Sequence, residues 1–207
     1  LGLSRVVGKP FLCTEYNHSA PNTYGSETAP IIAAYAARQD WDAVFLFAYS
    51  HRKDDWGTGR ITSFFDVDQN PARMATLPAA AAMFLRGDVP RAARQAIATP
   101  SADDWTEAGR LKGAWGLGGE SFGLTKPQAL THYVGISLDG DRPARSPDLD
   151  DPGVFAGQPG ADEKTGRVTV DARRSKAFIG SILAGPARLG DVTIAPRSNR
   201  QDWAAIT

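Results

Sequence analysis

The amino-acid sequence predicts an α/β segment followed by an all-β segment. In the first ninety residues, two apolar runs, 10–14 and 42–49, are each followed by a polar loop and a helix-like stretch. Beyond residue 105 the apolar runs are short, and Gly, Pro and Asp turn signals separate them. The first pattern predicts parallel strands buried on both faces, and the second predicts an antiparallel β-sandwich.

The first β/α unit is predicted over residues 10–39. The run Pro10-Phe-Leu-Cys-Thr14 is typical of a buried strand, and the polar stretch 15–26 follows it as a long loop. Ser26 is suited to the N-cap of a helix over 27–39. Glu27 and Pro30 are both tolerated in the first turn of such a helix.

The second β/α unit is predicted over residues 42–85. The run Asp42-Ala-Val-Phe-Leu-Phe-Ala-Tyr49 is a nearly continuous apolar strand, and a polar loop over 50–59 leads away from it. Asn70 is expected to cap a helix that opens with Pro71 and ends before Gly87.

Three regions are expected along the chain: the α/β segment over 1–89, a connector over 90–104 and the β-sandwich over 105–207, which is expected to be incomplete at its C-terminus. Strands of the sandwich are predicted at 131–138, 167–171, 177–183 and 191–195, and an irregular loop at 139–165.

Composition and charge exclude several classes of partner. The 207 residues include 23 Lys and Arg against 23 Asp and Glu, so the formal net charge is zero. Nucleic acids and anionic membranes need clustered basic surface, so we expect neither as a partner. The single cysteine, Cys13, forms no intramolecular disulfide and is expected to be a small buried strand residue.

A carboxylate marks the end of the first predicted strand. Glu15 follows Thr14 directly, where the loop begins. Catalytic groups of (β/α)₈ barrels occupy this carboxyl edge of the strands, and a carboxylate there can attack an anomeric carbon or stabilise an oxocarbenium-like transition state. The alternative interpretation is a solvated glutamate at a loop entry.

Residues 9–85 resemble the closing two β/α units of a clan A glycoside hydrolase barrel. The phrase Lys9-Pro-Phe-Leu-Cys-Thr-Glu15-Tyr-Asn17 is similar to the family's nucleophile phrase, and 21–27 and 34–42 are similar to bacterial enzymes of the cellulase and β-galactosidase type. The C-terminal hundred residues resemble, less specifically, the accessory β-domains that follow such barrels, above all at 188–194.

The resemblance implies a retaining glycoside hydrolase that cleaves β-glycosidic bonds in poly- or oligosaccharides, with no metal and no organic cofactor. Glu15 would be the nucleophile, and Tyr49 would orient its carboxylate. Substrate contacts are expected from Asn17, His18, Asn22, His51 and Trp56. For the loop residues among these, satisfaction of backbone groups in the loop is the alternative.

The second carboxyl group of a retaining enzyme lies about 5–5.5 Å from the nucleophile. In this clan the acid/base ends the fourth strand, for which residues 1–8 leave no room, so we expect an upstream barrel segment to supply it. The chain begins without methionine and stops inside the apolar run 203–207, and we expect it to be a piece of a longer protein. A secreted or periplasmic location is expected, with the cytoplasm left open; any signal peptide would lie upstream.

Two other function classes stay open. One is a non-catalytic carbohydrate-binding or structural fragment. The other is a serine esterase, because Gly119-Glu-Ser121-Phe-Gly123 matches the nucleophile-elbow pattern; its poor preceding strand favours a chance match. The start of a calcium loop at Asp66-Val-Asp68 lacks the required glycine and glutamate, so we expect no metal there.

Overall fold

The computed structural model describes residues 2–52, 59–61 and 63–138, together with six strands between 161 and 206. The chain divides into two compact units, Leu1–Asp151 and Pro152–Thr207. Each unit is described by itself.

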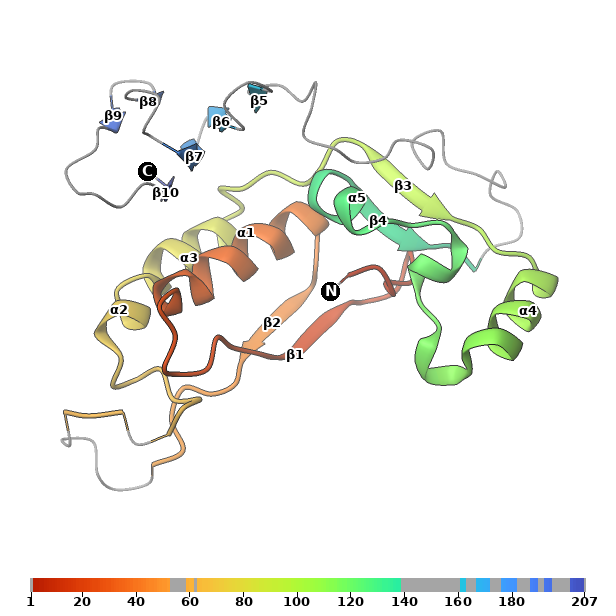
Figure 1. The fold of residues 1–207 in the computed structure, drawn as a ribbon, viewed down its shortest axis with the longest axis horizontal. Coiled ribbons are helices and arrows are strands. Elements are labelled where there is room, and N and C mark those ends of the chain that lie inside the picture. Colours follow the sequence, from red (N-terminus) through yellow and green to blue (C-terminus); the bar gives the residue numbers. More distant parts are fainter. Residues whose placement is uncertain are drawn as a thin grey trace. The chain divides into compact units, whose positions relative to one another are not determined.

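The first unit contains the expected β/α order. Strands β1 (Leu12–Tyr16) and β2 (Ala43–Leu46) are parallel and adjacent, with η1 (Gly25–Glu27) and α1 (Thr28–Gln39) between them. Helices α2 (Pro71–Met74) and α3 (Leu77–Leu85) follow β2. Figure 1 shows α1 and α3 together on one side of the β1–β2 pair.

Small side chains allow the helices to pack closely. Ala29 and Ala33 of α1 meet Ala80 and Met83 of α3 in one buried cluster. On its strand side α1 places Ile32 and Ala36 against Cys13 and Trp41. Cys13 is therefore a buried residue of the strand–helix interface, as its position in the apolar run indicated.

The helix ends differ in part from the expected ones. A turn of 3₁₀ helix occupies the expected N-cap at Ser26, and α1 begins at Thr28, whose Oγ1 donates to the carbonyl of Gly25 at 2.6 Å. Asn70 does cap a helix, accepting from the backbone N–H of Arg73 at 3.3 Å. The single helix expected after it is instead two, since α2 ends at Met74.

A second parallel pair occupies residues that were expected to form the connector and the start of the sandwich. Strands β3 (Gln95–Ala98) and β4 (Tyr133–Ile136) are parallel, with helices α4 (Ala102–Lys112) and α5 (Lys126–Thr131) and the 3₁₀ turns η2 (Ala114–Gly116) and η3 (Gly119–Phe122) between them. Val6 bridges to Ile136 in parallel, so β4 also pairs with the N-terminal segment.

The expected boundaries at 90, 104 and 105 therefore differ from the structure, in which this segment belongs to the first unit. The inward residues of β3 are Ala96 and Ala98, both almost fully buried. Alanine has low strand propensity, so an alanine-rich strand among arginines gives a weak sequence signal.

The described strands of this unit form two-stranded sheets. A closed barrel is not seen among them and stays a prediction. Of the helices that the structure describes, none is long and apolar enough to cross a membrane.

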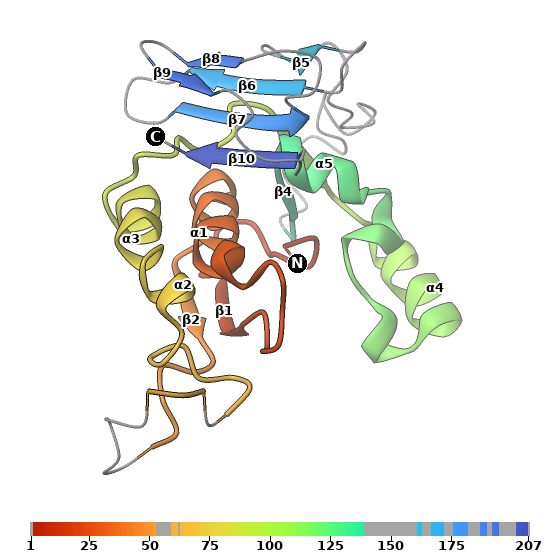
Figure 2. The same cartoon turned by 60° about the vertical axis from the view of Figure 1, so that its left-hand side comes forward.

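The second unit is antiparallel, as its turn signals predicted. Strands β5 (Ala161–Asp162), β6 (Arg167–Asp171), β7 (Lys176–Ser181) and β10 (Asp202–Ile206) form one sheet in the order β10-β7-β6-β5 (Figure 2). Strands β8 (Ala187–Leu189) and β9 (Val192–Ile194) form a separate pair. The packing of two sheets into a sandwich stays a prediction, and most of the expected loop over 139–165 lies outside the described residues.

Gln39 joins α1 to the α5–β4 segment. Its Nε2 donates to the carbonyls of Ala129 at 2.6 Å and His132 at 2.5 Å, and its Oε1 accepts from the N–H of Val134 at 3.0 Å. The side chain is fully buried. One amide thus satisfies three backbone groups that lie about ninety residues away along the chain.

We expect Gln39→Ala to lower the free energy of unfolding by about 2–4 kcal/mol, because buried backbone groups lose their partner. Urea denaturation followed by tryptophan fluorescence measures this. Ile31→Ala, on the exposed side of the same helix, is the matched control and should cost about 0.5 kcal/mol. Equal losses in the two variants would contradict the anchoring role of Gln39.

Candidate functional site

An irregularity in β1 turns Glu15 away from the helix layer. Cys13 and Tyr16 both pack into the cluster under α1, although they are three positions apart. The register shifts between them, so that β1 has one more residue than β2 over this stretch. In a regular strand Glu15 would share the face of Cys13. The extra residue instead leaves Thr14 and Glu15 exposed at the carboxyl end of the strand.

Apolar side chains are exposed along β1, along β2 and just after β2. Leu12, Phe45 and Phe47 are 48%, 54% and 37% exposed, and in the described part of the unit the helices cover the opposite face (Figure 1). Tyr49, 55% exposed, follows in the loop after β2. The site therefore combines an exposed carboxylate with exposed aromatic rings.

The side-chain amide of Asn17 connects the two strand ends. Its Nδ2 donates to the carbonyls of Phe47 and Phe65, each at 2.5 Å, and its Oδ1 accepts from Nη1 of Arg73 at 3.0 Å. Residues 63–70 also pair with the backbone of 48–49, through Ala48 N–H to Phe65 and Val67 N–H to Ala48. Asn17 thus fixes this loop against the end of β1.

A buried carboxylate holds His51. Nδ1 of His51 lies 2.5 Å from Oδ1 of Asp66, and the backbone N–H of His51 donates to both carboxylate oxygens at 3.2 Å. The side chain of Asp66 is 1% exposed and that of His51 is 46% exposed. The ring is thus anchored at Nδ1, while nearly half of the side chain is exposed.

A second buried acid in the same loop pairs with a cation. Asp68 accepts from Nη2 of Arg52, and both side chains are largely buried. Burial raises the pKa of Asp68, but hydrogen bonds from Arg52 and Ser50 and the charge of Arg52 outweigh this and hold it below its ordinary value. This pair ties Arg52 to the loop over 63–70.

The other site residues expected from the sequence lie in different settings. His18 Nε2 lies 2.8 Å from the hydroxyl of Tyr16, and burial raises the pKa of that tyrosine, so the hydroxyl stays protonated at neutral pH. Asn22 accepts from the N–H of Tyr24 at 2.8 Å, which is a local turn. Trp56 lies outside the described residues.

Tyr49 and Glu15 have exposed side chains, and no hydrogen bond joins them among the residues that the structure describes. The orienting role of Tyr49 stays a prediction. Sequence reasoning did not assign Asp66 or Arg73 to the site. The sequence signal for Asp66 is the Asp-Val-Asp pattern at 66–68. Its interpretation as the start of a calcium loop did not indicate a pairing with His51.

The esterase pattern lacks the geometry of a nucleophile elbow. Ser121 lies in the 3₁₀ turn η3, which no strand enters directly, and its hydroxyl donates to the carbonyl of Gly116 at 3.5 Å. His132 is fully buried, with Nδ1 2.8 Å from Oγ1 of Thr131. Nothing in this geometry favours acyl transfer at Ser121.

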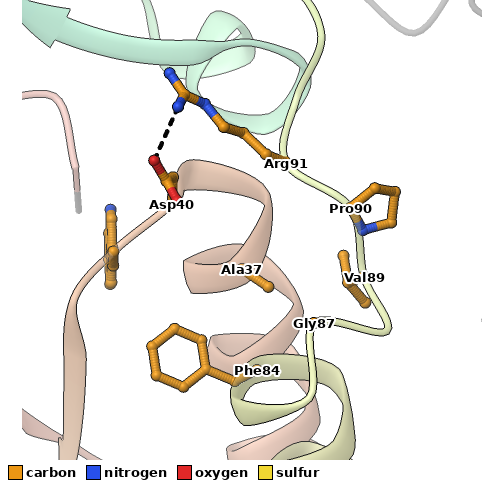
Figure 3. Close-up of a pocket in the computed structure, with 8 residues that line it drawn as sticks. Ala37, Asp40, Phe84, Gly87, Val89, Pro90 and Arg91 are labelled. Atoms are coloured by element: carbon orange, nitrogen blue, oxygen red, sulfur yellow. Dashed lines mark hydrogen bonds and ion pairs between the residues drawn. The ribbon is translucent and has the colours of Figure 1, made fainter.

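A hollow of about 250 Å³ lies between the C-terminal ends of α1 and α3 (Figure 3). Phe84, Val89 and Pro90 line it, and Arg91 and Asp40 pair across its rim at 2.9 Å. It lies at the end of α1 from which the chain enters β2, and is therefore remote along the strands from Glu15. Among the described residues, no group of three or more His, Cys, Asp or Glu side chains is arranged to hold a metal ion.

Comparison with protein-family models, with curated proteins and with solved structures finds no match to this chain. The site must therefore be interpreted from its own geometry.

We expect Asn17→Asp to lower the free energy of unfolding by about 1–3 kcal/mol, because the carbonyls of Phe47 and Phe65 both lose the hydrogen bond from the amide. Asn22→Asp is the matched control, since a carboxylate accepts from the N–H of Tyr24 as well as the amide does; its effect should be within about 0.5 kcal/mol. Urea denaturation of both variants measures the difference. Similar values would show that the Asn17 amide does not hold the loop.

The lowered pKa of Asp68 predicts a pH-dependent contribution to stability. A carboxyl group with a depressed pKa in the folded state stabilises it above the ordinary value of 3.8 and loses that contribution as the pH falls below it. Asp68→Asn should therefore cost about 1–3 kcal/mol at pH 7 and progressively less at pH 3. Urea denaturation at both pH values tests this, and a pH-independent difference would contradict it.

Proposed function

We propose that this chain is part of a retaining glycoside hydrolase that cleaves β-glycosidic bonds in poly- or oligosaccharides, with Glu15 as the nucleophile. One observation carries the proposal: the irregularity in β1 exposes Glu15 at the carboxyl end of a parallel strand, beside exposed aromatic rings. Carboxylates at this position and aromatic faces that can stack on sugar rings are what glycoside hydrolysis requires.

In the proposed reaction an oxygen of the Glu15 carboxylate forms a bond to the anomeric carbon as the glycosidic C–O bond breaks. The leaving oxygen takes a proton from a second carboxyl group. Water, deprotonated by that same group, then displaces Glu15 from the glycosyl-enzyme and restores both carboxyl groups to their starting forms.

The second carboxyl group is proposed to come from an upstream barrel segment, which would cover the exposed face at Leu12 and Phe45. This face supports the proposal because apolar sheet faces of a barrel are buried by neighbouring strands. A secreted or periplasmic setting belongs to the same proposal.

Within this proposal the roles of the polar residues differ. Tyr49 orients the Glu15 carboxylate, and His51, Trp56, His18 and Asn22 are candidate substrate contacts. Asn17 has its amide fully occupied, so we propose that it positions the loop after β2 instead of contacting sugar.

Covalent trapping tests the nucleophile. A 2,4-dinitrophenyl 2-deoxy-2-fluoro-β-glycoside needs no protonation of its leaving group, so labelling does not depend on the acid/base. In the protein that includes the proposed upstream segment, we expect one fluoroglycosyl adduct per chain, located on Glu15 by peptide mass spectrometry. Glucosides, galactosides, mannosides and xylosides form the panel.

Glu15→Gln should abolish the adduct, and Glu107→Gln, on the exposed surface of α4, should leave it unchanged. No adduct with any sugar of the panel, alongside retained binding to oligosaccharides, would favour the non-catalytic alternative. An adduct on another residue would overturn the assignment of Glu15.

A further inference from the structure

The loop after β2 fixes one edge of the His51 ring. Nδ1 faces the buried Asp66 carboxylate at 2.5 Å, and the ring of Phe47 meets the imidazole edge-on, with centroids 5.4 Å apart. The backbone N–H of His51 donates to the same carboxylate. Rotation of the imidazole would break the contact with Asp66, so the free edge, which carries Nε2, keeps one direction.

The buried acid also selects a tautomer. An ionised carboxylate only accepts hydrogen bonds, so Nδ1 of a neutral His51 carries the proton. Nε2 then presents a lone pair at the exposed edge of the ring. Carboxylates that orient histidines in this way act through the histidine and do not touch the ligand themselves.

We infer that Asp66 is a positioning residue that holds His51 so that Nε2 accepts a hydrogen bond from a hydroxyl group of the sugar substrate. The inference rests on the proposed function and adds to it a preference for a neutral sugar over an acidic one. A lone pair backed by a buried negative charge favours an O–H donor and disfavours a carboxylate or sulfate at the same place. The substrate ring at this position is therefore a neutral sugar.

The tautomer can be measured without substrate. The chain has three histidines, so long-range ¹H–¹⁵N correlation spectra resolve their ring nitrogens. We expect His51 in its neutral form to carry its proton on Nδ1, and Asp66→Asn to shift the population toward Nε2, because an amide can donate to Nδ1. A dominant Nε2–H tautomer in the unsubstituted protein would overturn the inference.

The contribution of Asp66 and His51 to the reaction is tested by the burst of dinitrophenolate that is released from an unfluorinated 2,4-dinitrophenyl β-glycoside. We expect Asp66→Asn and His51→Ala each to slow the burst about 10-fold or more. The double variant should be no slower than His51→Ala alone, since Asp66 acts through His51. If the two substitutions slowed the burst independently, so that their fold-effects multiplied in the double variant, the positioning role of Asp66 would be overturned.

Asp88→Asn is the matched control, because Asp88, like Asp66, is a buried acid; it pairs with Arg86 beyond the end of α3. It should change the unfolding midpoint and leave the burst rate unaltered. If Asp66→Asn behaves like Asp88→Asn, then Asp66 is only structural and the inference is wrong.

The sugar preference has its own comparison. The dinitrophenyl glucoside should react faster than the corresponding glucuronide, and His51→Ala should bring the ratio of the two rates closer to one. A faster reaction of the glucuronide that His51→Ala abolishes would overturn the assignment of a lone pair to Nε2. Absence of any adduct on Glu15 would overturn the proposed function and with it the sugar contact, whereas a Glu15 adduct that forms independently of Asp66 would overturn this inference alone.

Discussion

The candidate site depends on one side-chain amide. Asn17 donates from a single nitrogen to the carbonyls of Phe47 and Phe65, and so joins the end of β1 to the end of β2 and to the loop that returns toward α2. These are irregular backbone segments, in which the Phe65 carbonyl also accepts from the N–H of Ala48 at 3.3 Å. Without the amide, the loop that carries Asp66 would be joined to the segment after β1 through the hydrogen bond from the N–H of Ala20 to Phe64, at 2.7 Å, and would lose its contact at the strand end itself. The relative placement of the carboxylate and the histidine therefore follows from this contact.

The loop after β2 is held mainly by polar groups. Val67 is its deeply buried apolar residue, while Asp66 and Arg73 are charged and almost fully buried. Removing charges from water costs several kcal/mol for each ion, and a buried pair repays this only with good geometry. Arg73 has one partner at Asn17, and its Nε and Nη2 are without one among the described residues. Replacing buried charges by well-packed apolar residues is often neutral or stabilising in proteins, so we attribute these charges to the geometry that they impose on Asn17 and His51.

The sequence contained enough information to locate the strands, because apolar runs such as 42–49 are typical of strands. The expected burial on both faces is not seen among the described residues, since Phe45 and Phe47 are exposed. The sequence also placed Asn70 correctly as a cap, since asparagine is favoured at the N-cap and proline at the first position of a helix. It failed for β3, where buried alanines among arginines leave no apolar contrast. It also could not place Glu15 on the exposed face. That placement depends on a register shift between β1 and β2, which arises from tertiary pairing and leaves no mark in the alternation of residues 12–16.

The same reasoning explains why Asp66 was missed while His51 was found. A histidine at a strand end is a candidate site residue because it can accept, donate and exchange protons near neutral pH. An aspartate in Phe-Asp-Val-Asp is instead typical of a solvated turn. Only the three-dimensional structure shows that one of the two acids, Asp66, faces His51 while the other, Asp68, faces Arg52. The two acids are two positions apart, yet Asp66 pairs with a half-exposed imidazole and Asp68 with a buried guanidinium. Asp68 fixes the loop through its pairing with the guanidinium of Arg52, whereas Asp66 sets the direction of an imidazole ring, which can exchange protons.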